Sequence, residues 1–233
     1  QKASITSVTL PDSLRSIGEE GFRLSALTAV ALPERFETLG VCAFCSADKL
    51  DSIDLGGTIT VGGSAFESTK AKAGINFRPE LGRLATIGDF AFSRTAPASV
   101  ALPDSVTTVG EQAFSENTAL TSFHIGSGVT SFAETALYND RKIATLTVSA
   151  DNPVYSAEHN VLYRKADDGL HLMLSPAANT LTDYTVRAGT VEIGATAFAN
   201  NKTLTRVVLP DGLKVIGDDA FAGTSALTEL VIP

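Results

Sequence analysis

Hydrophobic and polar residues follow one another along this chain in a pattern that recurs about every 23 residues. The clearest copies are LPDSLRSIGEEGF (residues 10–22), LPDSVTTVGEQAF (102–114) and LPDGLKVIGDDAF (209–221). Self-similarity at this period is typical of a solenoid, in which each coil buries its apolar face only against neighbouring coils. The sequence predicts about nine coils with a tenth begun, which start at or near Ile5, Leu27, Leu50, Gly74, Pro97, Leu120, Ile143, Leu181, Leu204 and Leu227.

Each unit opens with a segment that predicts a short strand. In residues 5–10 (ITSVTL), 120–125 (LTSFHI) and 204–209 (LTRVVL), apolar and polar residues alternate, so the apolar ones should point into the coil. In several units proline follows, which has no N–H to give to a ladder, and an Asp-Ser or Asp-Gly pair after it suits a turn. We therefore expect an α/β repeat protein with a parallel β-sheet on one face of the solenoid and short helical or irregular segments on the other.

A phenylalanine in the returning half of most units is expected to fill the interior of the coil. The residue before it is alanine in six units and Gly21 in the first, small enough to let neighbouring coils approach closely. Loss of one such ring to alanine should cost about 3–5 kcal/mol. The predicted row consists of Phe22, Phe44, Phe66, Phe92, Phe114, Phe198 and Phe221, with Leu137 in the sixth unit.

One unit departs strongly from the period. Its expected strand at residues 143–148 runs into about 149–180 instead of the usual return, and the next unit starts only at Leu181. Residues 161–163 and 170–174 flank the Ala-Asp-Asp-Gly sequence at 166–169, which predicts a β-hairpin. We refer to residues 149–180 as the interruption.

Composition narrows the possible functions. A formal net charge of −8 without a Lys/Arg cluster argues against a nucleic-acid partner or an anionic membrane surface. No apolar run approaches the roughly 20 residues needed to cross a bilayer, so we expect no membrane insertion by this segment. Because no Pro/Ser-rich linker or block of charge divides the repeat, the sequence predicts one solenoid domain over residues 1–233. Because neither end has the character of a capping repeat, we expect a fragment of a longer protein.

The repeat unit LTSVTLPDSLxxIGxxAF and the interruption NPVYSAEHNVLYRK…LSP resemble the BspA-type leucine-rich repeats of bacterial surface proteins, and the resemblance covers nearly the whole chain. It implies a secreted or cell-surface protein that adheres to host matrix proteins or to other bacteria. The chain departs from the family in one visible respect. Many family repeats carry cysteine a few residues after the phenylalanine, whereas most units here have serine, glutamate or alanine nearby.

Few residues suggest chemistry. Cys42 and Cys45 form a CxxC that flanks a repeat phenylalanine, and we expect either two incidental, partly exposed thiols or a local disulfide. No second ligand pair of matched spacing predicts a metal site. His124 lies two residues after Ser122, but the facing positions one coil away carry no carboxylate to orient its ring. We predict no enzyme and no cofactor.

The outward face of the sheet is the better candidate for a binding site, and the residues on it are mostly small and polar. The candidates for contact with a ligand are Asp54, Asn76, His124, Thr147, Asp183 and Arg206. On the interruption, Tyr155 and Tyr163 are the only plausible exposed aromatic residues, although they would equally serve to pin the hairpin onto the coil. Three hypotheses remain: a module that binds a protein partner, a glycan-binding module that uses these tyrosines, and a structural spacer.

Overall fold

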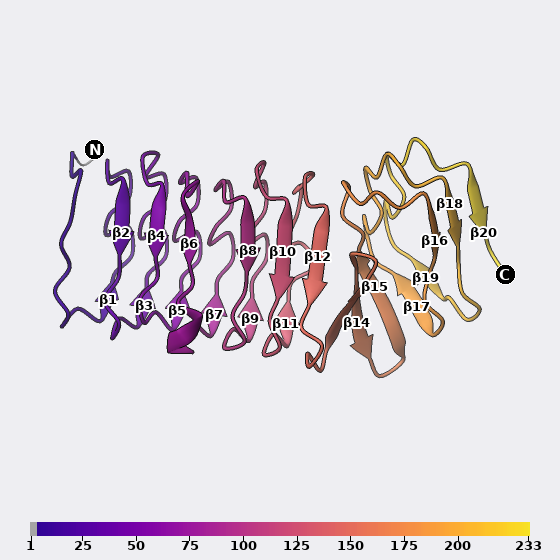
Figure 1. The fold of residues 1–233 in the computed structure, drawn as a ribbon, viewed down its shortest axis with the longest axis horizontal. Coiled ribbons are helices and arrows are strands. Elements are labelled where there is room, and N and C mark those ends of the chain that lie inside the picture. Colours follow the sequence, from indigo (N-terminus) through magenta and orange to yellow (C-terminus); the bar gives the residue numbers. More distant parts are fainter. Residues whose placement is uncertain (1–3) are drawn as a thin grey trace. The chain divides into compact units, whose positions relative to one another are not determined.

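Short strands recur along the chain in the computed structural model, which describes residues 4–233 (Figure 1). They fall into two units, each described separately here. Unit 1 comprises the residues up to Leu120 together with Ile125–Asp140, and unit 2 comprises Thr121–His124 together with Arg141–Pro233.

Unit 1 contains two columns of short strands. In the first column, β2 (Ala29–Ala31), β4 (Ser52–Asp54) and β6 (Gly74–Asn76) form a parallel sheet in which Val30, Ile53 and Ile75 are in register, and β8 (Ser99–Ala101) follows in the chain. The central residues of β2 and β4 are buried, as the alternation in the sequence predicts. The expected strand at residues 5–10 is wrong, because these residues join no ladder, although Val8 and Leu10 are half-buried between exposed neighbours.

On the other face, where we expected short helical or irregular segments, the returning halves of the coils form a second parallel sheet, which we call the second column. Within residues 4–233 the helical structure is one 3₁₀ turn, η1 (Pro79–Leu81). The return of each coil provides only two extended residues, usually a β-branched or polar one followed by a buried apolar one, and this is too short to nucleate a helix. The six strands of this sheet are β1 (Ser16–Ile17), β3 (Thr38–Leu39), β5 (Thr60–Val61), β7 (Thr86–Ile87), β9 (Thr108–Val109) and β11 (Ser131–Phe132).

The turn around each phenylalanine is hydrogen-bonded to the next coil. Around Phe44, the amide nitrogen donates to Ala65 O (2.7 Å), and the amides of Cys42 and Ser46 donate to the same neighbouring turn. Cys42 and Ser46 have φ of 57° and 56°, so a left-handed residue stands on each side of residues 43–45 and the segment cannot continue as an α-helix. Close approach also explains the glycine before the turn, because a Cβ on Gly62 would lie 2.6 Å from Leu39 O.

The predicted row of phenylalanines is confirmed within each unit. In unit 1 the rings of Phe22 and Phe44 are stacked with centroids 5.2 Å apart, and the row continues through Phe66 and Phe92 to Phe114 at 5.3 Å steps. In unit 2 Phe198 stacks on Phe221 at 5.1 Å. Leu137 is buried where it replaces the ring in the sixth coil.

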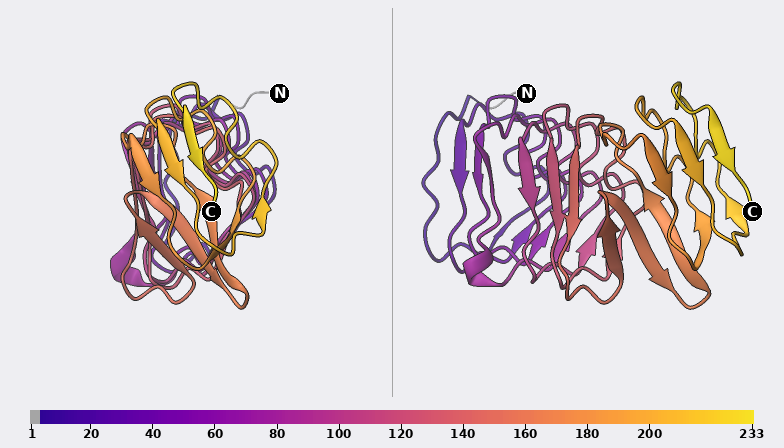
Figure 2. Two further views of the ribbon diagram at one scale, coloured as in Figure 1. Left: turned by 90° about the vertical axis from the view of Figure 1, so that its right-hand side faces the viewer. Right: turned by 45° about the vertical axis from the view of Figure 1, so that its right-hand side comes forward.

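Unit 2 holds the interruption, and the predicted hairpin is confirmed. Strands β14 (Val161–Ala166) and β15 (Gly169–Leu174) pair antiparallel, and β13 (Tyr155–Glu158), which we did not predict, pairs with the outer side of β14. β15 then pairs parallel with β17 (Thr190–Ile193), which pairs with β19 (Val215–Ile216), so the hairpin extends the second-column sheet of unit 2 (Figure 2). The first column of this unit contains β10 (Ser122–Ile125), β12 (Thr145–Val148), β16 (Asp183–Thr185), β18 (Arg206–Val208) and β20 (Glu229–Val231).

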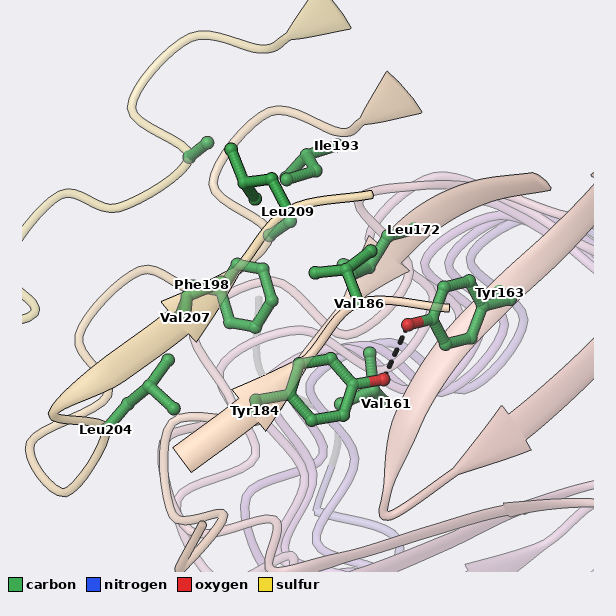
Figure 3. Packing of buried hydrophobic residues seen from close by; sticks show 12 residues of the cluster. Val161, Tyr163, Leu172, Tyr184, Val186, Ile193, Phe198, Leu204, Val207 and Leu209 are labelled. Carbon is green, nitrogen blue, oxygen red and sulfur yellow. Dashed lines mark hydrogen bonds between the residues drawn. The ribbon is translucent and has the colours of Figure 1, made fainter. Parts of the chain in front are cut away.

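The core of unit 2 joins the interruption to the regular coils. Buried residues of β14 and β15, such as Val161 and Leu172, lie in one cluster with Phe198 and Val207 (Figure 3). Aliphatic and aromatic side chains fill this cluster at low exposure, so the hairpin is fixed to the coil by apolar burial.

Candidate binding surfaces

On unit 1, two of the predicted surface residues belong to one hydrogen-bonded network. Asn76 Nδ2 donates to Asp54 Oδ2 (3.2 Å), and Arg78 donates to the same oxygen (3.1 Å). Arg78 also forms ion pairs with Glu80 and, at 3.7 Å, with Glu34. The bond to Asp54, and then the one to Glu80, raises the pKa of Arg78, so its charge is permanent. The network presents a fixed cation among three carboxylates.

Arg78 was not among the predicted residues. It follows the buried Phe77 and has φ of 50° and ψ of 57°, just before the 3₁₀ turn η1. This left-handed conformation breaks the alternation of the strand, so the period-two pattern gave no indication of where its side chain points. The extra residues between Phe77 and Leu84, relative to the other coils, were the only signal in the sequence.

In unit 2, His124 and Thr147 are neighbours, as their predicted positions on adjacent strands require. His124 Nδ1 lies 2.9 Å from Thr147 Oγ1, and His124 Nε2 lies 3.2 Å from Ser149 Oγ. Both ring nitrogens of His124 thus face hydroxyl groups, and within the described residues its hydrogen-bond partners include no carboxylate. This arrangement lacks the acid that would orient an imidazole as a general base.

The other two predicted residues, Asp183 and Arg206, are in register on β16 and β18. Arg206 Nε forms an ion pair with Glu229 Oε1 (3.0 Å) on the next strand, β20. Asp183 is exposed, and its Oδ2 accepts a hydrogen bond of 3.4 Å from Thr182. The outward face of this sheet therefore carries the carboxylate of Asp183 on β16, and an ion pair joins the next two strands, β18 and β20.

The two tyrosines of the interruption are buried, and the prediction of exposed rings is wrong. Tyr155 is 3% exposed and Tyr163 is 0% exposed. Tyr163 Oη lies 2.5 Å from Tyr184 Oη (Figure 3). The guanidinium carbon of Arg187 lies 5.2 Å from the centroid of the Tyr163 ring. Burial raises the pKa of both Tyr163 and Tyr184. These contacts pin the hairpin onto the coil, which was the alternative interpretation.

Unit 2 also contains an open groove that sequence reasoning missed. Its volume is about 690 Å³, and it lies between the turn at Glu158 and His159 and residues 181–188, which include β16. Arg187 Nε contacts Glu158 Oε2 at 3.3 Å and Arg187 also donates to Ser156 (3.0 Å), so this charge is held at the wall of the groove. The sequence offered no signal for the groove, because its two walls lie in segments of different pattern and are joined by the buried tyrosine pair and the Arg187–Glu158 ion pair.

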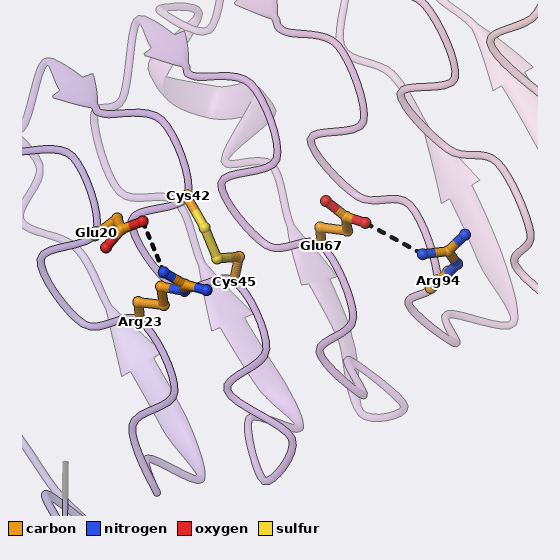
Figure 4. The surroundings of a disulfide bond; sticks show 6 residues. All are labelled: Glu20, Arg23, Cys42, Cys45, Glu67 and Arg94. Carbon is orange, nitrogen blue, oxygen red and sulfur yellow. Dashed lines mark hydrogen bonds and ion pairs between the residues drawn. A yellow bond between two sulfur atoms is a disulfide. The ribbon is translucent and has the colours of Figure 1, made fainter. Parts of the chain in front are cut away.

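Cys42 and Cys45 form a disulfide, so of the two expected alternatives the local disulfide is the one present. Cys45 is buried and Cys42 is half-buried. Around the bond lie the ion pairs Arg23–Glu20 (2.8 Å) and Arg94–Glu67 (3.4 Å), both on the turns that flank the phenylalanine row (Figure 4).

Within residues 4–233, no three histidine, cysteine, aspartate or glutamate side chains are grouped as metal ligands. In the same range, no helix has the length and apolar character needed to span a bilayer.

A comparison with protein families matches the model described as BspA type Leucine rich repeat region, with six copies, to residues 1–85, 59–163 and 177–233. A comparison with curated proteins found no match. The solved structures with a similar fold include three at identities of 20–23%.

A leucine rich cell surface protein from Faecalibacterium prausnitzii A2-165 has a TM-score of 0.68 at 23% identity, over 94% of this chain and 64% of that one. A leucine-rich repeat protein from Eubacterium ventriosum ATCC 27560 has a TM-score of 0.71 at 22% identity, over 88% and 60% of the two chains. One from Bacteroides ovatus ATCC 8483 has a TM-score of 0.57 at 20% identity, over 97% and 66%. The chain thus spans somewhat less than two thirds of the length of the first two, and the matched families and folds are repeat scaffolds with no catalytic family among them.

Proposed function

Because the chain belongs to the BspA-type leucine-rich repeat family, we propose that it is a non-catalytic interaction module that binds a protein partner at a bacterial cell surface. The observation that carries the proposal is the pre-formed polar face of the first-column strands. On β4 and β16 the central side chain is buried while the outward ones, Ser52 and Asp54 on β4 and Asp183 and Thr185 on β16, are exposed or half-buried, so an ordered ladder holds a polar surface in place. A surface that is already ordered loses little entropy on binding, which favours contact with a partner over many weak interactions.

The Asp54–Asn76–Arg78 network supports the same proposal. Its members are held by the hydrogen bonds described above, so a partner would meet fixed charges rather than mobile side chains. The glycan-binding alternative loses its support, because sugars stack on exposed rings and Tyr155 and Tyr163 are buried. The disulfide agrees with an extracellular location, since disulfides persist in oxidising compartments. Adhesion to host matrix proteins or to other bacteria is the specific role we propose.

Binding to immobilised host matrix proteins and bacterial surface proteins tests the proposal, with a glycan array in parallel. Asp54→Ala with Asn76→Ala removes the polar groups of unit 1, and His124→Ala with Arg206→Ala removes those of unit 2. We expect at least one pair to weaken protein binding about tenfold or more, which corresponds to about 1.4 kcal/mol.

A matched control places the same number of changes on the second-column sheet, where Thr38 and Ser131 are exposed. Thr38→Ala with Ser131→Ala should leave binding unchanged. Equal binding by the sheet-face variants and the control would contradict the proposal, and so would binding to no protein on the panel. Labelling of intact cells with an antibody to the chain tests the surface location separately.

A further inference from the structure

Strand β16 has one free edge. In its three-stranded sheet the order is β16-β18-β20, so β18 is the only strand that pairs with β16 among the described residues. Arg206 N donates to Thr182 O (3.1 Å), and Val186 N donates to Val208 O (2.9 Å). These bonds fix the direction of every peptide group in the strand.

The amide groups of Asp183 and Thr185 point away from β18, because successive peptide groups of a strand alternate between its two edges. No backbone bond joins them to the interruption within the described residues. Each presents one N–H and one C=O toward the groove, in the spacing that an added strand requires. Both residues are exposed.

The interruption caps the neighbouring strand β12 but leaves β16 open. Asn160 Oδ1 accepts a hydrogen bond from Leu146 N (3.2 Å), so a side chain satisfies an edge amide of β12. Asn179 Nδ2 holds the same turn by donating to His159 O (2.9 Å). Beyond that turn lies the groove of about 690 Å³, whose other wall is β16 itself.

Charge in the groove favours a basic occupant. Two carboxylates line it, Glu158 and Asp183, against one guanidinium, that of Arg187. Arg187 is already paired with Glu158, so the carboxylate of Asp183 is the charge left without a cation among these three. A lysine or arginine on an added strand would lie next to it on the outward face.

We propose that the free edge of β16 is a docking site for an extended peptide segment of a protein partner, which adds as a strand and places a basic side chain beside Asp183. This inference deepens the proposed function by naming the chemistry of the partner and rests on it. In such strand addition, main-chain hydrogen bonds supply affinity and alternate side chains supply selectivity.

Selection from a phage-displayed library of random 12-residue peptides on the immobilised full chain tests the inference. Enriched peptides should share an alternating pattern with lysine or arginine, and a synthetic version N-methylated on alternate residues should bind at least about tenfold more weakly, since it lacks the donors for the edge. Asp183→Asn should weaken the unmodified peptide severalfold and reduce its salt dependence.

A matched pair of variants at one position isolates the edge. Thr185→Pro removes the outward N–H without touching the ladder to β18, whereas Thr185→Val keeps that N–H. The proline variant should lose at least tenfold in affinity and the valine variant less than about threefold. Hydrogen exchange on the unmodified chain provides a readout independent of any variant: the amides of Asp183 and Thr185 should exchange rapidly when free and become protected with peptide bound.

Several results would overturn the inference: no enriched peptide, equal binding by both Thr185 variants, or no added protection at these amides. Self-association of the chain that Thr185→Pro abolishes would also overturn it, because the edge would then belong to a second copy. Protein binding that survives Thr185→Pro but is lost in the sheet-face variants would reject the strand-addition site and leave the proposed function standing.

Discussion

Asp140 is a buried carboxyl group that should make the stability of unit 1 depend on pH. It lies three residues after Leu137, in the column that Asn117 occupies one coil earlier. Asp140 is 6% exposed, and its Oδ1 accepts a hydrogen bond from Asn117 N (2.6 Å), but its Oδ2 has no hydrogen-bond partner. Burial raises the pKa of Asp140 to about 8, and the nearby charge of Glu116 adds to the shift against the opposing Asn117 bond.

The sign follows from proton linkage. Native Asp140 holds its proton up to about pH 8, while in the unfolded chain it loses the proton near pH 3.8. The stabilisation from this group is therefore fully present below the unfolded pKa and is lost as pH rises through the native pKa. At 1.36 kcal/mol per pKa unit, the roughly three units between pH 3.8 and pH 7 correspond to at most about 4 kcal/mol. Relaxation or water entry on ionisation would reduce this value to a lower limit of about 1 kcal/mol.

Asp140→Asn removes the ionisation while keeping an oxygen for the Asn117 amide. The new amide group resembles that of Asn117, whose Nδ2 donates to Phe92 O (3.2 Å) and Phe114 O (2.5 Å). We expect the variant to raise the free energy of unfolding by about 1–4 kcal/mol at pH 7 and by almost nothing at pH 4. The measurement is equilibrium denaturant unfolding of both proteins at intervals from pH 4 to pH 9.

Asp12→Asn serves as the control, because Asp12 is exposed and its substitution should change stability by less than about 0.5 kcal/mol at every pH. Taking the difference between variant and parent cancels the titration of all other groups. A difference that is flat between pH 4 and pH 9 would refute the reasoning, as would a loss of stability at pH 7.

Four further changes test the architecture. Phe66→Ala should lower the free energy of unfolding by about 3–5 kcal/mol in denaturant melts, since it opens a gap inside the stacked row; a loss below 1 kcal/mol would show that the row is not packed. Gly62→Ala should cost about 1–3 kcal/mol by forcing a methyl against the backbone of the previous coil, measured in the same way. Reduction of the Cys42–Cys45 disulfide should cost no more than about 2 kcal/mol because the closed loop is short, and thermal melts with and without reductant check this. Tyr184→Phe should cost about 1–2 kcal/mol, and in the parent protein spectrophotometric titration should show the buried tyrosine hydroxyls ionising only on unfolding.

The phenylalanine row could be predicted because one residue type recurs at one place in each coil. Phe22 and Phe44 each lie four residues after a glycine and directly after a small residue, so stacking of coils brings them together without any further information. The same reasoning placed Asp54 beside Asn76 and His124 beside Thr147, since each pair is one coil apart. Periodicity fixes contacts between equivalent positions, and these contacts hold the solenoid together.

The second sheet could not be predicted with the same ease, because two extended residues such as Thr60 and Val61 carry too little pattern to distinguish a strand from a turn. The turns that follow its strands contain left-handed residues, for example Cys42 and Ser46, and these are not glycine. Hydrogen bonds to the next coil hold them there against their intrinsic preference. The preference of these residues for right-handed φ is therefore outweighed by backbone hydrogen bonds that form only when the coils are stacked.

Asp140, by contrast, left a signal that alignment of the units shows. The position three residues after the ring is Ser25, Ala47, Thr69, Thr95, Asn117 and then Asp140, a column of groups that are neutral except for the last. Thr95 Oγ1 donates to Asn117 Oδ1 (2.8 Å), so the column forms part of the polar lining of the coil. A carboxylate in a column of otherwise neutral side chains indicates either a partner cation or a retained proton. The structure favours the retained proton.

The interruption exposes one edge of a first-column strand beside a groove. Where a strand such as β4 or β18 is paired on both sides, only its side chains are available to a partner. Here the chain leaves the first column after β12, satisfies the Leu146 amide through Asn160, and returns at β16 under the buried Tyr163–Tyr184 pair. That pair holds the hairpin firmly enough to keep the groove open, while the hairpin itself pairs with β17 in the other sheet. Main-chain donors and acceptors on β16 are thus exposed next to a carboxylate, which makes this groove the place on unit 2 where selectivity for a partner should arise.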